Sequence, residues 1–297
     1  MMKPKKIDIE GYNAHMGVET LHPLVSVINF NDIDEIHSFL FNIDFYAVFL
    51  KETKIGTLTY GRQNYDYKEG SIVCVSTGQV LGIDAPAEKF KPTGWGVLFH
   101  PDFLFKTELG KNLKKYTYFG YDSNEALHLA ERERSVIIEC FRNIQTELER
   151  PIDKHSQKLI ATYIELLLDY CNRFYDRQFI TRNKVNSDVI VRFEQLVNEY
   201  FASDRPSKEG LPEVKMFASQ LCLSPNYFGD LIRKECGISP QEYIQNTVIR
   251  LAKERLMDTS STVAQVADSL GFQYSPYFSR LFKKVVGQTP SEFRMSV

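Results

Sequence analysis

The densest group of side chains able to bind an anion lies within residues 274–294. This stretch has one acid, Glu292, and four cations: Arg280, Lys283, Lys284 and Arg294. Its local charge of +3 contrasts with the formal charge of −2 for the whole chain of 297 residues. Arginine can hold a guanine edge through two hydrogen bonds, and lysine can neutralise a phosphate. The placement of the charge therefore favours a nucleic acid as partner, with modest non-specific affinity and a shallow salt dependence.

Cysteine and histidine, which carry most thiol and metal chemistry, are scattered. No two cysteines have Cys-x-x-Cys spacing, and no two histidines have His-x-His spacing or lie four residues apart. The five cysteines are Cys74, Cys140, Cys171, Cys222 and Cys236. The pattern disfavours disulfides and zinc, so we expect packed thiols, no metal, no cofactor and no enzyme activity. One redox-sensing cysteine is the alternative.

The composition is that of a folded protein with two domains. Hydrophobic residues make up 43% and charged residues 25%, as in ordinary globular proteins. A domain typically has ~100–200 residues, so this chain is long enough for two. Its apolar runs fall short of the ~18–20 residues that span a bilayer, and the start MMKPKKIDIE has no apolar segment after its lysines. We therefore expect a cytoplasmic protein with no membrane partner.

The first half of the chain changes from a strand-like to a helical pattern. Short extended runs cover residues 45–50, 54–60, 65–67, 71–76, 79–83 and 94–99, separated by turn residues. This spacing favours a small antiparallel β-barrel or sandwich. Two amphipathic helices are expected at 124–148 and 154–174, the first capped by Ser123 or Asn124. Both could pack on the sheet, or part of one apolar stripe could form a dimer seam.

Two segments in the last third, 214–243 and 263–293, repeat one pattern. The offset is 49 residues before a turn, from Ala218 to Ala267, and 50 after it, from Phe228 to Phe278. Each copy has a short helix, a turn, a second helix with a Tyr-Phe pair, then a basic pair, Gly and Pro. The pattern predicts two helix–turn–helix units. Tyr227-Phe228 and Tyr277-Phe278 should anchor the second helices, whose opposite faces could then enter a groove.

Local signals predict where these helices begin and end. Ser224-Pro225 offers an N-cap followed by proline at the first helical position, and Ser275-Pro276 repeats the arrangement. Gly237 and Gly287 follow the basic pairs, where a left-handed C-cap is favoured. Residues 240–257 should form a helix that holds the two units at a fixed separation. Successive major-groove segments lie ~34 Å apart, so both second helices could reach one face of DNA.

This part of the chain resembles the DNA-binding domain of the AraC/XylS family of bacterial transcriptional regulators. The resemblance is carried by ASQLCLSPNYF (218–228), LAKERLM (251–257), VADSLGF (266–272), YFSRLFKK (277–284) and GQTPSEFR (287–294). It covers about residues 187–297, with 188–201 as the first helix. The implied fold is α+β: a cupin-like sensor and dimerisation domain at 1–175 with two amphipathic helices, a linker at 176–187, and an all-α domain at 188–297. The helix–turn–helix units would lie at about 213–236 and 262–286, joined by a helix at about 240–258.

In the family, bases are read by the exposed face of each second helix, near its N-terminus. The matching positions are Asn226, Gly229 and Asp230 in the first copy and Ser275, Pro276, Ser279 and Arg280 in the second. Arg280 is the strongest candidate, with a phosphate contact as its alternative. Gly229 and Asp230 suggest weaker or more tolerant reading by the first copy. The phosphate candidates are Arg233, Lys234, Lys283, Lys284 and Arg294.

The resemblance also implies partners. They are double-stranded DNA, a small-molecule effector and a second copy of the chain, with RNA polymerase as a further candidate. Candidate effector contacts are Tyr46, Tyr60, Arg62, Tyr65 and Trp95, for which core packing is the alternative. Two other functions stay open: a cupin-type enzyme, which the lack of paired histidines disfavours, and a repair regulator that accepts alkyl groups on cysteine.

Overall fold

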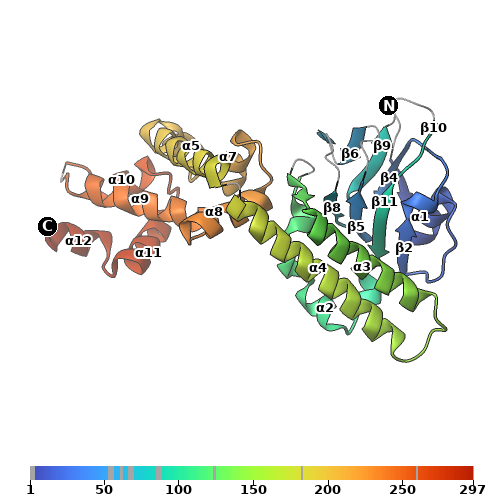
Figure 1. The fold of residues 1–297 in the computed structure, drawn as a ribbon. Coiled ribbons are helices and arrows are strands. Elements are labelled where there is room, and N and C mark those ends of the chain that lie inside the picture. Colours follow the sequence, from blue (N-terminus) through green and yellow to red (C-terminus); the bar gives the residue numbers. More distant parts are fainter. Residues whose placement is uncertain are drawn as a thin grey trace. The chain divides into compact units, whose positions relative to one another are not determined.

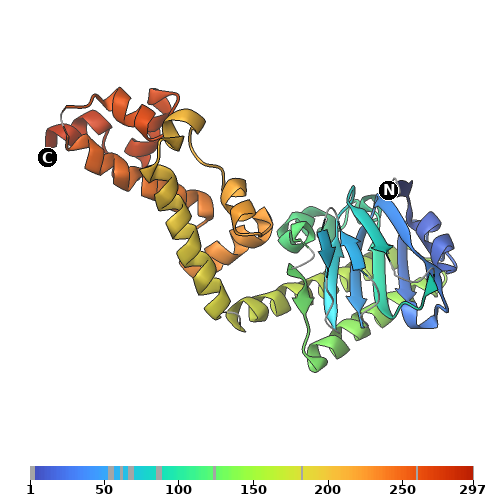
Figure 2. The ribbon, with the colours of Figure 1, turned by 90° about the horizontal axis from the view of Figure 1, so that it is seen from above.

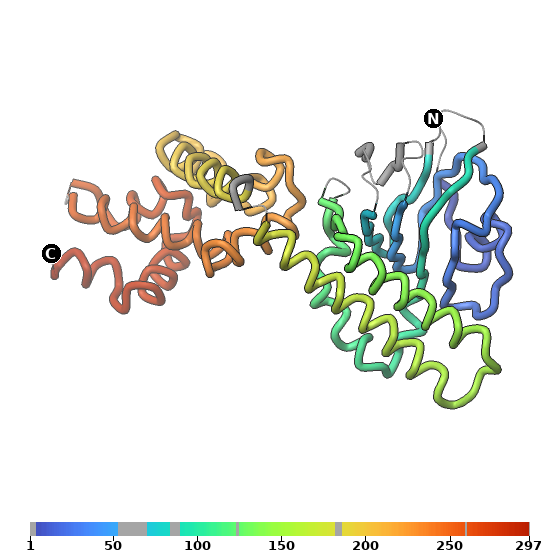
Figure 3. Tube along the Cα trace, in the orientation of Figure 1, coloured from blue at the N-terminus to red at the C-terminus, as the bar shows by residue number. Residues whose placement is uncertain are grey.

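The computed structural model describes residues 4–52, 57–60, 63–65, 70–84, 89–122, 125–181, 183–258 and 260–296 (Figures 1 and 3). The chain divides into two compact units, Met1–Thr181 and Arg182–Val297. Their boundary falls inside 176–187, the segment expected to link the domains. The described residues of that segment belong to two helices, α4 (Ser156–Thr181) and α5 (Asn183–Ala202).

The strands of the N-terminal unit form two five-stranded sheets. The first has the order β1 (Lys5–Ile7), β4 (Phe39–Ile43), β9 (Val80–Asp84), β6 (Thr57–Tyr60) and β7 (Gln63–Tyr65). The second has the order β12 (Leu127–His128), β8 (Ser71–Val75), β5 (Tyr46–Lys51), β11 (Gly94–Phe99) and β2 (Val25–Asn29). A separate pair joins β10 (Lys89–Phe90) to β3 (Ile36–His37). Figure 2 shows strands of this unit side by side.

Of the expected antiparallel barrel or sandwich, the described strands do not show a closed barrel, and one pair is not antiparallel. The described strands form separate sheets, because the edge strands of one sheet do not pair with those of the other. In addition, β1 pairs with β4 in parallel, with Lys5 opposite Phe41. The two sheets share a core instead of hydrogen bonds. Phe39 and Phe41 of the first sheet and Phe49 and Leu98 of the second belong to one buried cluster.

Helices cover the other face of the second sheet (Figure 1). Helix α3 (Glu131–Leu148) contacts β2 and β11, and α4 contacts β12. Neighbouring residues of β5 point to opposite faces of the sheet, and both faces are therefore buried. Phe49 faces the shared core, and Val48, on the other face, is also fully buried. The remaining helical segments of this unit are α1 (Ile9–Met16), α2 (Glu108–Asn112) and the short 3₁₀ turns Phe30–Asp32, Pro101–Leu104, Leu113–Lys115 and Thr117–Gly120.

Both long helices differ in extent from the prediction. Helix α3 begins at Glu131 rather than near residue 124, because Leu127–His128 pairs with β8 as a strand. The expected caps Ser123 and Asn124 lie outside the described residues. Helix α4 continues past residue 174 because its last turns are held by the sheet. Gln178 donates to the Ala126 carbonyl (3.1 Å) and accepts from the His128 amide (2.8 Å).

The C-terminal unit is helical throughout its described elements. After α5 come α6 (Arg205–Glu209), α7 (Val214–Gln220), α8 (Pro225–Cys236), α9 (Pro240–Leu256), α10 (Val263–Ser269), α11 (Ser275–Val286) and α12 (Pro290–Ser296). Aromatic side chains form its core. Phe193 of α5 lies edge-on to Phe217 and Phe228, at centroid distances of 5.4 and 4.9 Å. Among the described residues of the whole chain, no helix is both long and apolar enough to cross a membrane.

Candidate nucleic-acid interface

The two turns of the repeat have the same backbone geometry. In the first, the Leu223 amide donates to the Ala218 carbonyl at 3.0 Å; in the second, the Phe272 amide donates to the Ala267 carbonyl at 3.0 Å. The residue before each donor is left-handed, with φ of 56° at Cys222 and 91° at Gly271. This is the Schellman way of ending a helix. Each sequence copy therefore folds into an equivalent helix–turn–helix.

The starts of the second helices differ, and one predicted cap is wrong. The Ser224 hydroxyl accepts from the Tyr227 amide at 3.1 Å, which caps α8 as predicted. In the second copy Tyr274 occupies the N-cap position, and Ser275 is the first residue of α11. The extra residue of this copy therefore lies between α10 and α11. Gly237 and Gly287 both have left-handed C-cap conformations, which confirms their predicted role.

Helix α11 presents an exposed cationic face. Phe278, Leu281 and Phe282 are buried, whereas Arg280, Lys283 and Lys284 are exposed. The Arg280 Nε donates to the Pro276 carbonyl of its own helix at 3.4 Å. Ion pairs of these three cations do not occur among the described residues, and α11 itself contains no acid. Ser275 and Ser279 are half-buried, and Pro276 is exposed.

Helix α8 has a balanced face instead. Asn226 is exposed, and a Cβ atom added at Gly229 would meet no atom within 4 Å, so both positions face open space. Asp230 lies 3.6 Å from the Arg233 guanidinium in an ion pair along the helix. Lys234 is exposed beside them. Part of the positive charge predicted to meet phosphate is thus offset within α8.

Helix α9 connects the two helix–turn–helix units. Its 17 residues make a rod of about 25 Å at 1.5 Å per residue. The Ser239 hydroxyl caps its N-terminus just after α8, by accepting from the Glu242 amide at 3.2 Å. Near its C-terminus Arg255 donates to the Ser269 carbonyl (2.9 Å), the Ser269 hydroxyl (2.7 Å) and the Phe201 carbonyl (3.3 Å). The two helix–turn–helix units are therefore fixed at opposite ends of α9.

Two residues lie differently from their expected roles. The Arg294 Nε donates to the Leu256 carbonyl at 3.0 Å, and its Nη2 atom is buried. Arg294 therefore holds α12 against the end of α9 and is withdrawn from the phosphate candidates. Tyr277, expected in the core, is 45% exposed, whereas its counterpart Tyr227 is 5% exposed. The Tyr277 ring lies beside the Phe272 ring, at a centroid distance of 5.9 Å.

Tyr274, which was not among the predicted site residues, is 65% exposed at the start of α11. An exposed tyrosine at a recognition helix can donate its hydroxyl to a phosphate. The extra residue in the second copy was the available signal, because it shifts Tyr274 to the N-cap position.

Two of the five candidate effector residues, Tyr46 and Trp95, pack against other aromatic side chains. The Tyr46 ring stacks on Phe99 at 5.5 Å, and buried Trp95 stacks on Phe141 of α3 at 6.1 Å. Both therefore pack on the helix-covered face of the second sheet, which was the alternative considered. Tyr60 and Tyr65 are described only as parts of β6 and β7, and Arg62 lies outside the described residues.

The thiols of the N-terminal unit do not suit nucleophilic chemistry. Cys74, Cys140 and Cys171 are buried. Burial raises the pKa of all three thiols, to about 11 for Cys140. A nucleophilic cysteine needs a lowered pKa. Clusters of three potential metal ligands are likewise absent from the part of the chain that the structure describes.

Two helix–turn–helix units on a shared helix, one with an exposed cationic face, define a DNA-binding domain. A helix-turn-helix domain family matches residues 217–296. The uncharacterised HTH-type transcriptional regulator YijO of Escherichia coli (strain K12) is 26% identical over 225 residues, which cover 76% of this chain and 73% of that protein.

Two further relatives are shorter matches. The arabinose operon regulatory protein of Escherichia coli (strain K12) is 39% identical over 82 residues, or 28% of each chain. The bifunctional transcriptional activator/DNA repair enzyme AdaA of Bacillus subtilis (strain 168) is 39% identical over 71 residues, or 24% of this chain and 34% of that protein. Together with the repeat, these matches show a DNA-binding transcriptional regulator whose helix–turn–helix domain is similar in sequence to that of the arabinose operon regulatory protein.

Proposed function

We propose that this regulator recognises a specific DNA sequence mainly through α11, with Arg280 as its principal base-reading residue. The observation that supports this is the face of α11, where Arg280, Lys283 and Lys284 are exposed and the helix has no acid. Arg280 would hold guanine O6 and N7, and the two lysines would neutralise phosphates. Ser275, Pro276 and Ser279 line the same end of the helix and would contact neighbouring base edges.

Helix α8 is proposed to make weaker or more sequence-tolerant contacts. Asn226 can read adenine, and Gly229 leaves room for the DNA backbone to approach closely. Asp230 can accept a hydrogen bond from cytosine N4 but is repelled by phosphates, and its pair with Arg233 limits that repulsion. Arg233 and Lys234 are then the phosphate contacts of this unit.

The test of base reading is selection of bound sequences from a random DNA library, followed by titration of the selected site. Arg280→Ala should relax the preference at one base pair and weaken binding by ~1–3 kcal/mol. Lys283→Gln is the matched control, because loss of a phosphate contact should weaken all sequences alike and lower the salt slope by about 1. No enriched sequence, or an Arg280→Ala variant with unchanged affinity and preference, would contradict the proposal.

We further propose that the N-terminal unit, at about residues 1–175, is a cupin-like module that binds a small-molecule effector and dimerises. Helix α4 supports dimerisation, because Leu159 and Leu166 are 42% and 43% exposed. With the half-buried Tyr163 and Tyr170 they form a stripe at spacings of three and four residues, as in a helix–helix seam. RNA polymerase is a candidate partner of the DNA-bound dimer in the cytoplasm.

Sedimentation of the full chain tests the seam. Leu166→Asp should convert a dimer to a monomer, because it places a charge in an apolar contact. Lys158→Asp introduces the same side chain on an exposed position of α4 away from the stripe and should leave the dimer intact. Equal oligomeric states for the two variants would refute the seam.

A further inference from the structure

Helix α11 exposes a tyrosine that the core of its unit does not use. Tyr277 is 45% exposed, whereas Tyr227, at the equivalent place in α8, is 5% exposed. The aromatic core of the second helix–turn–helix unit is built around Phe278, which lies 5.1 Å from Phe272 and 5.7 Å from Phe282 between ring centroids. Tyrosine rings left partly in water are typical of binding surfaces. Tyr277 is therefore available for a contact outside the protein.

Tyr277 lies on the same face of α11 as the exposed cations. It is the third residue of the helix, three residues before Arg280 and seven before Lys284. Residues at these spacings share one face of a helix, and all three side chains are exposed. Tyr277 is also almost one turn closer than Arg280 to the N-terminus of α11. In a helix–turn–helix this end of the second helix meets the base edges.

Neighbouring residues hold the Tyr277 ring at this face. The ring lies beside that of Phe272, with a centroid distance of 5.9 Å and an interplanar angle of 51°. Phe272 is itself buried. The Tyr277 amide donates to the Tyr274 carbonyl at 2.9 Å, which closes the first turn of the helix. Phe272 thus supports part of the ring, and the exposed part can meet a ligand. A ring that is already supported loses less conformational entropy on binding.

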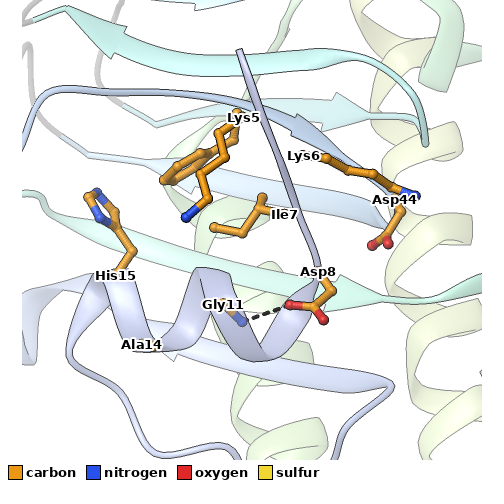
Figure 4. Close-up of a pocket in the computed structure, with 9 residues that line it drawn as sticks. Lys5, Lys6, Ile7, Asp8, Gly11, Ala14, His15 and Asp44 are labelled. Atoms are coloured by element: carbon orange, nitrogen blue, oxygen red, sulfur yellow. Dashed lines mark hydrogen bonds between the residues drawn. The ribbon is translucent and has the colours of Figure 1, made fainter. Parts of the chain in front are cut away.

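In the hollow beside α1, by contrast, the polar side chains do not converge. Figure 4 shows Lys5 and His15 on one side of β1 and Lys6 and Asp44 on the other. The His15 ring lies edge-on to Phe41 at a centroid distance of 5.0 Å, so it belongs to the packing of α1 on the first sheet. The face of α11 is different, because its tyrosine and its cations share one surface.

The chemistry of the major groove identifies what a ring at this position can contact. The base edges there present hydrogen-bond donors and acceptors, and thymine adds an apolar group, its C5-methyl. Aromatic and other apolar side chains distinguish thymine by packing on this methyl group. A phosphate would instead engage the tyrosine hydroxyl and make no use of the ring.

We propose that Tyr277 is a second base-reading residue of α11, and that its ring packs on the C5-methyl group of a thymine close to the guanine held by Arg280. Helix α11 thus recognises two neighbouring bases by different means, one through an apolar contact and the other through hydrogen bonds. The inference rests on the sequence recognition by α11 proposed above, and it adds a base and a contact that do not depend on Arg280.

Replacement of thymine by deoxyuridine in the selected DNA site tests the contact without changing the protein. Uracil lacks the methyl group and keeps the hydrogen-bonding groups of thymine. Each thymine of the site is replaced in turn, and the Kd of the full chain is measured by fluorescence anisotropy. We expect a thymine at which the replacement weakens binding about fourfold, which corresponds to ~0.8 kcal/mol for one methyl group returned to water.

Three variants assign this methyl effect to the Tyr277 ring. Tyr277→Ala removes the ring and should bind the thymine and uracil sites equally. Tyr277→Phe keeps the ring without its hydroxyl and should retain the ratio of about four. Val285→Ala is the matched control and should also retain it, because Val285 is likewise 45% exposed on α11 but lies in its last turn. The ratio is measured within each variant, so a general loss of affinity or of folded protein cancels.

The outcomes separate this inference from the proposed function. It is overturned if uracil has no effect at any thymine, or if the methyl effect persists in Tyr277→Ala. Weaker binding of all sequences by Tyr277→Phe, with no methyl effect in the parent, would assign the hydroxyl to a phosphate instead. If Arg280→Ala relaxes a base preference while uracil has no effect, the proposed function stands and this inference alone fails. If Tyr277→Ala abolishes a methyl effect while Arg280→Ala changes nothing, the thymine contact stands and the role of Arg280 is refuted. A selection that enriches no sequence refutes both.

Discussion

Replacing Gly271 by alanine tests the packing that orients the second helix–turn–helix unit. Gly271 has φ of 91°, and a Cβ atom there would lie 2.7 Å from both the carbonyl carbon and the oxygen of Gly210. The left-handed conformation costs alanine ~1–2 kcal/mol, and the shift of backbone needed to relieve the overlap adds ~1–3 kcal/mol. We therefore expect Gly271→Ala to lower the free energy of unfolding by about 3 kcal/mol. Urea denaturation of residues 182–297, followed by far-UV circular dichroism, should show a midpoint lower by about 1 M or more.

Gly229→Ala is the matched control for this experiment. It makes the same chemical change in the middle of α8, where the added Cβ meets no atom within 4 Å. Alanine exceeds glycine in helix propensity, so this variant should be stabilised by up to ~1 kcal/mol. A Gly271→Ala midpoint equal to that of the parent would show that Gly210 does not close on Gly271, and the structure of this turn would have to be revised.

Three further substitutions probe other parts of the C-terminal unit. Cys222→Gly should raise stability by ~1 kcal/mol, because Cys222 is exposed with φ of 56°, and an unchanged urea midpoint would contradict strain there. Arg255→Ala should lower stability by ~2–4 kcal/mol, since the guanidinium joins Ser269 to Phe201, and a loss below ~0.5 kcal/mol would show that these hydrogen bonds contribute little. Arg294→Ala should lower stability by ~1–3 kcal/mol yet leave the salt slope of DNA binding unchanged; a slope lower by about 1 would restore Arg294 as a phosphate contact.

The C-terminal helices could be predicted closely because their signals are local. Ser224-Pro225 at the start of α8 and Gly237 and Gly287 after the second helices act within one turn of the chain. The connecting helix was expected at residues 240–257 and α9 spans Pro240–Leu256. The pattern occurs twice, and each signal was therefore available in two copies. The two copies fold alike only if the residues that they share determine the turn.

The N-terminal unit was less predictable because its boundaries depend on pairing between distant segments. The start of α3 is set by Leu127 pairing with Ile72, 55 residues earlier. Helix α1 and strand β4 were not predicted: α1 has only eight residues, and its clearest signals are the Asp8 cap and the left-handed Gly17. Whether two sheets close into a barrel likewise depends on edge-to-edge pairing, which no single segment encodes.

Exposure was the part of the site that residue type could not predict. Tyr227 and Tyr277 occupy equivalent places in the repeat, yet one is buried and the other is exposed, because the second turn is one residue longer. Arg294 belongs to the same cationic stretch as Arg280, but α12 returns to the end of α9 and turns the guanidinium to Leu256. Both differences arise from tertiary packing and are invisible in the charge pattern.

The two helix–turn–helix units have the same fold but differ in charge, and this difference indicates that they contribute differently to DNA binding. Helix α8 carries Arg233 and Lys234 together with Asp230 and Glu235, and its charges cancel. Arg233 is engaged with Asp230, and Glu235 accepts from Asn186 of α5 at 3.0 Å. For Arg233 to approach a phosphate, Asp230 must approach it too, so the attraction of one is reduced by the repulsion of the other. Helix α11 itself contains no acid. Under the function proposed above, the second helix–turn–helix unit would supply most of the electrostatic attraction to DNA as well as the principal base contact, and the first would add the more sequence-tolerant contacts of Asn226 and Asp230.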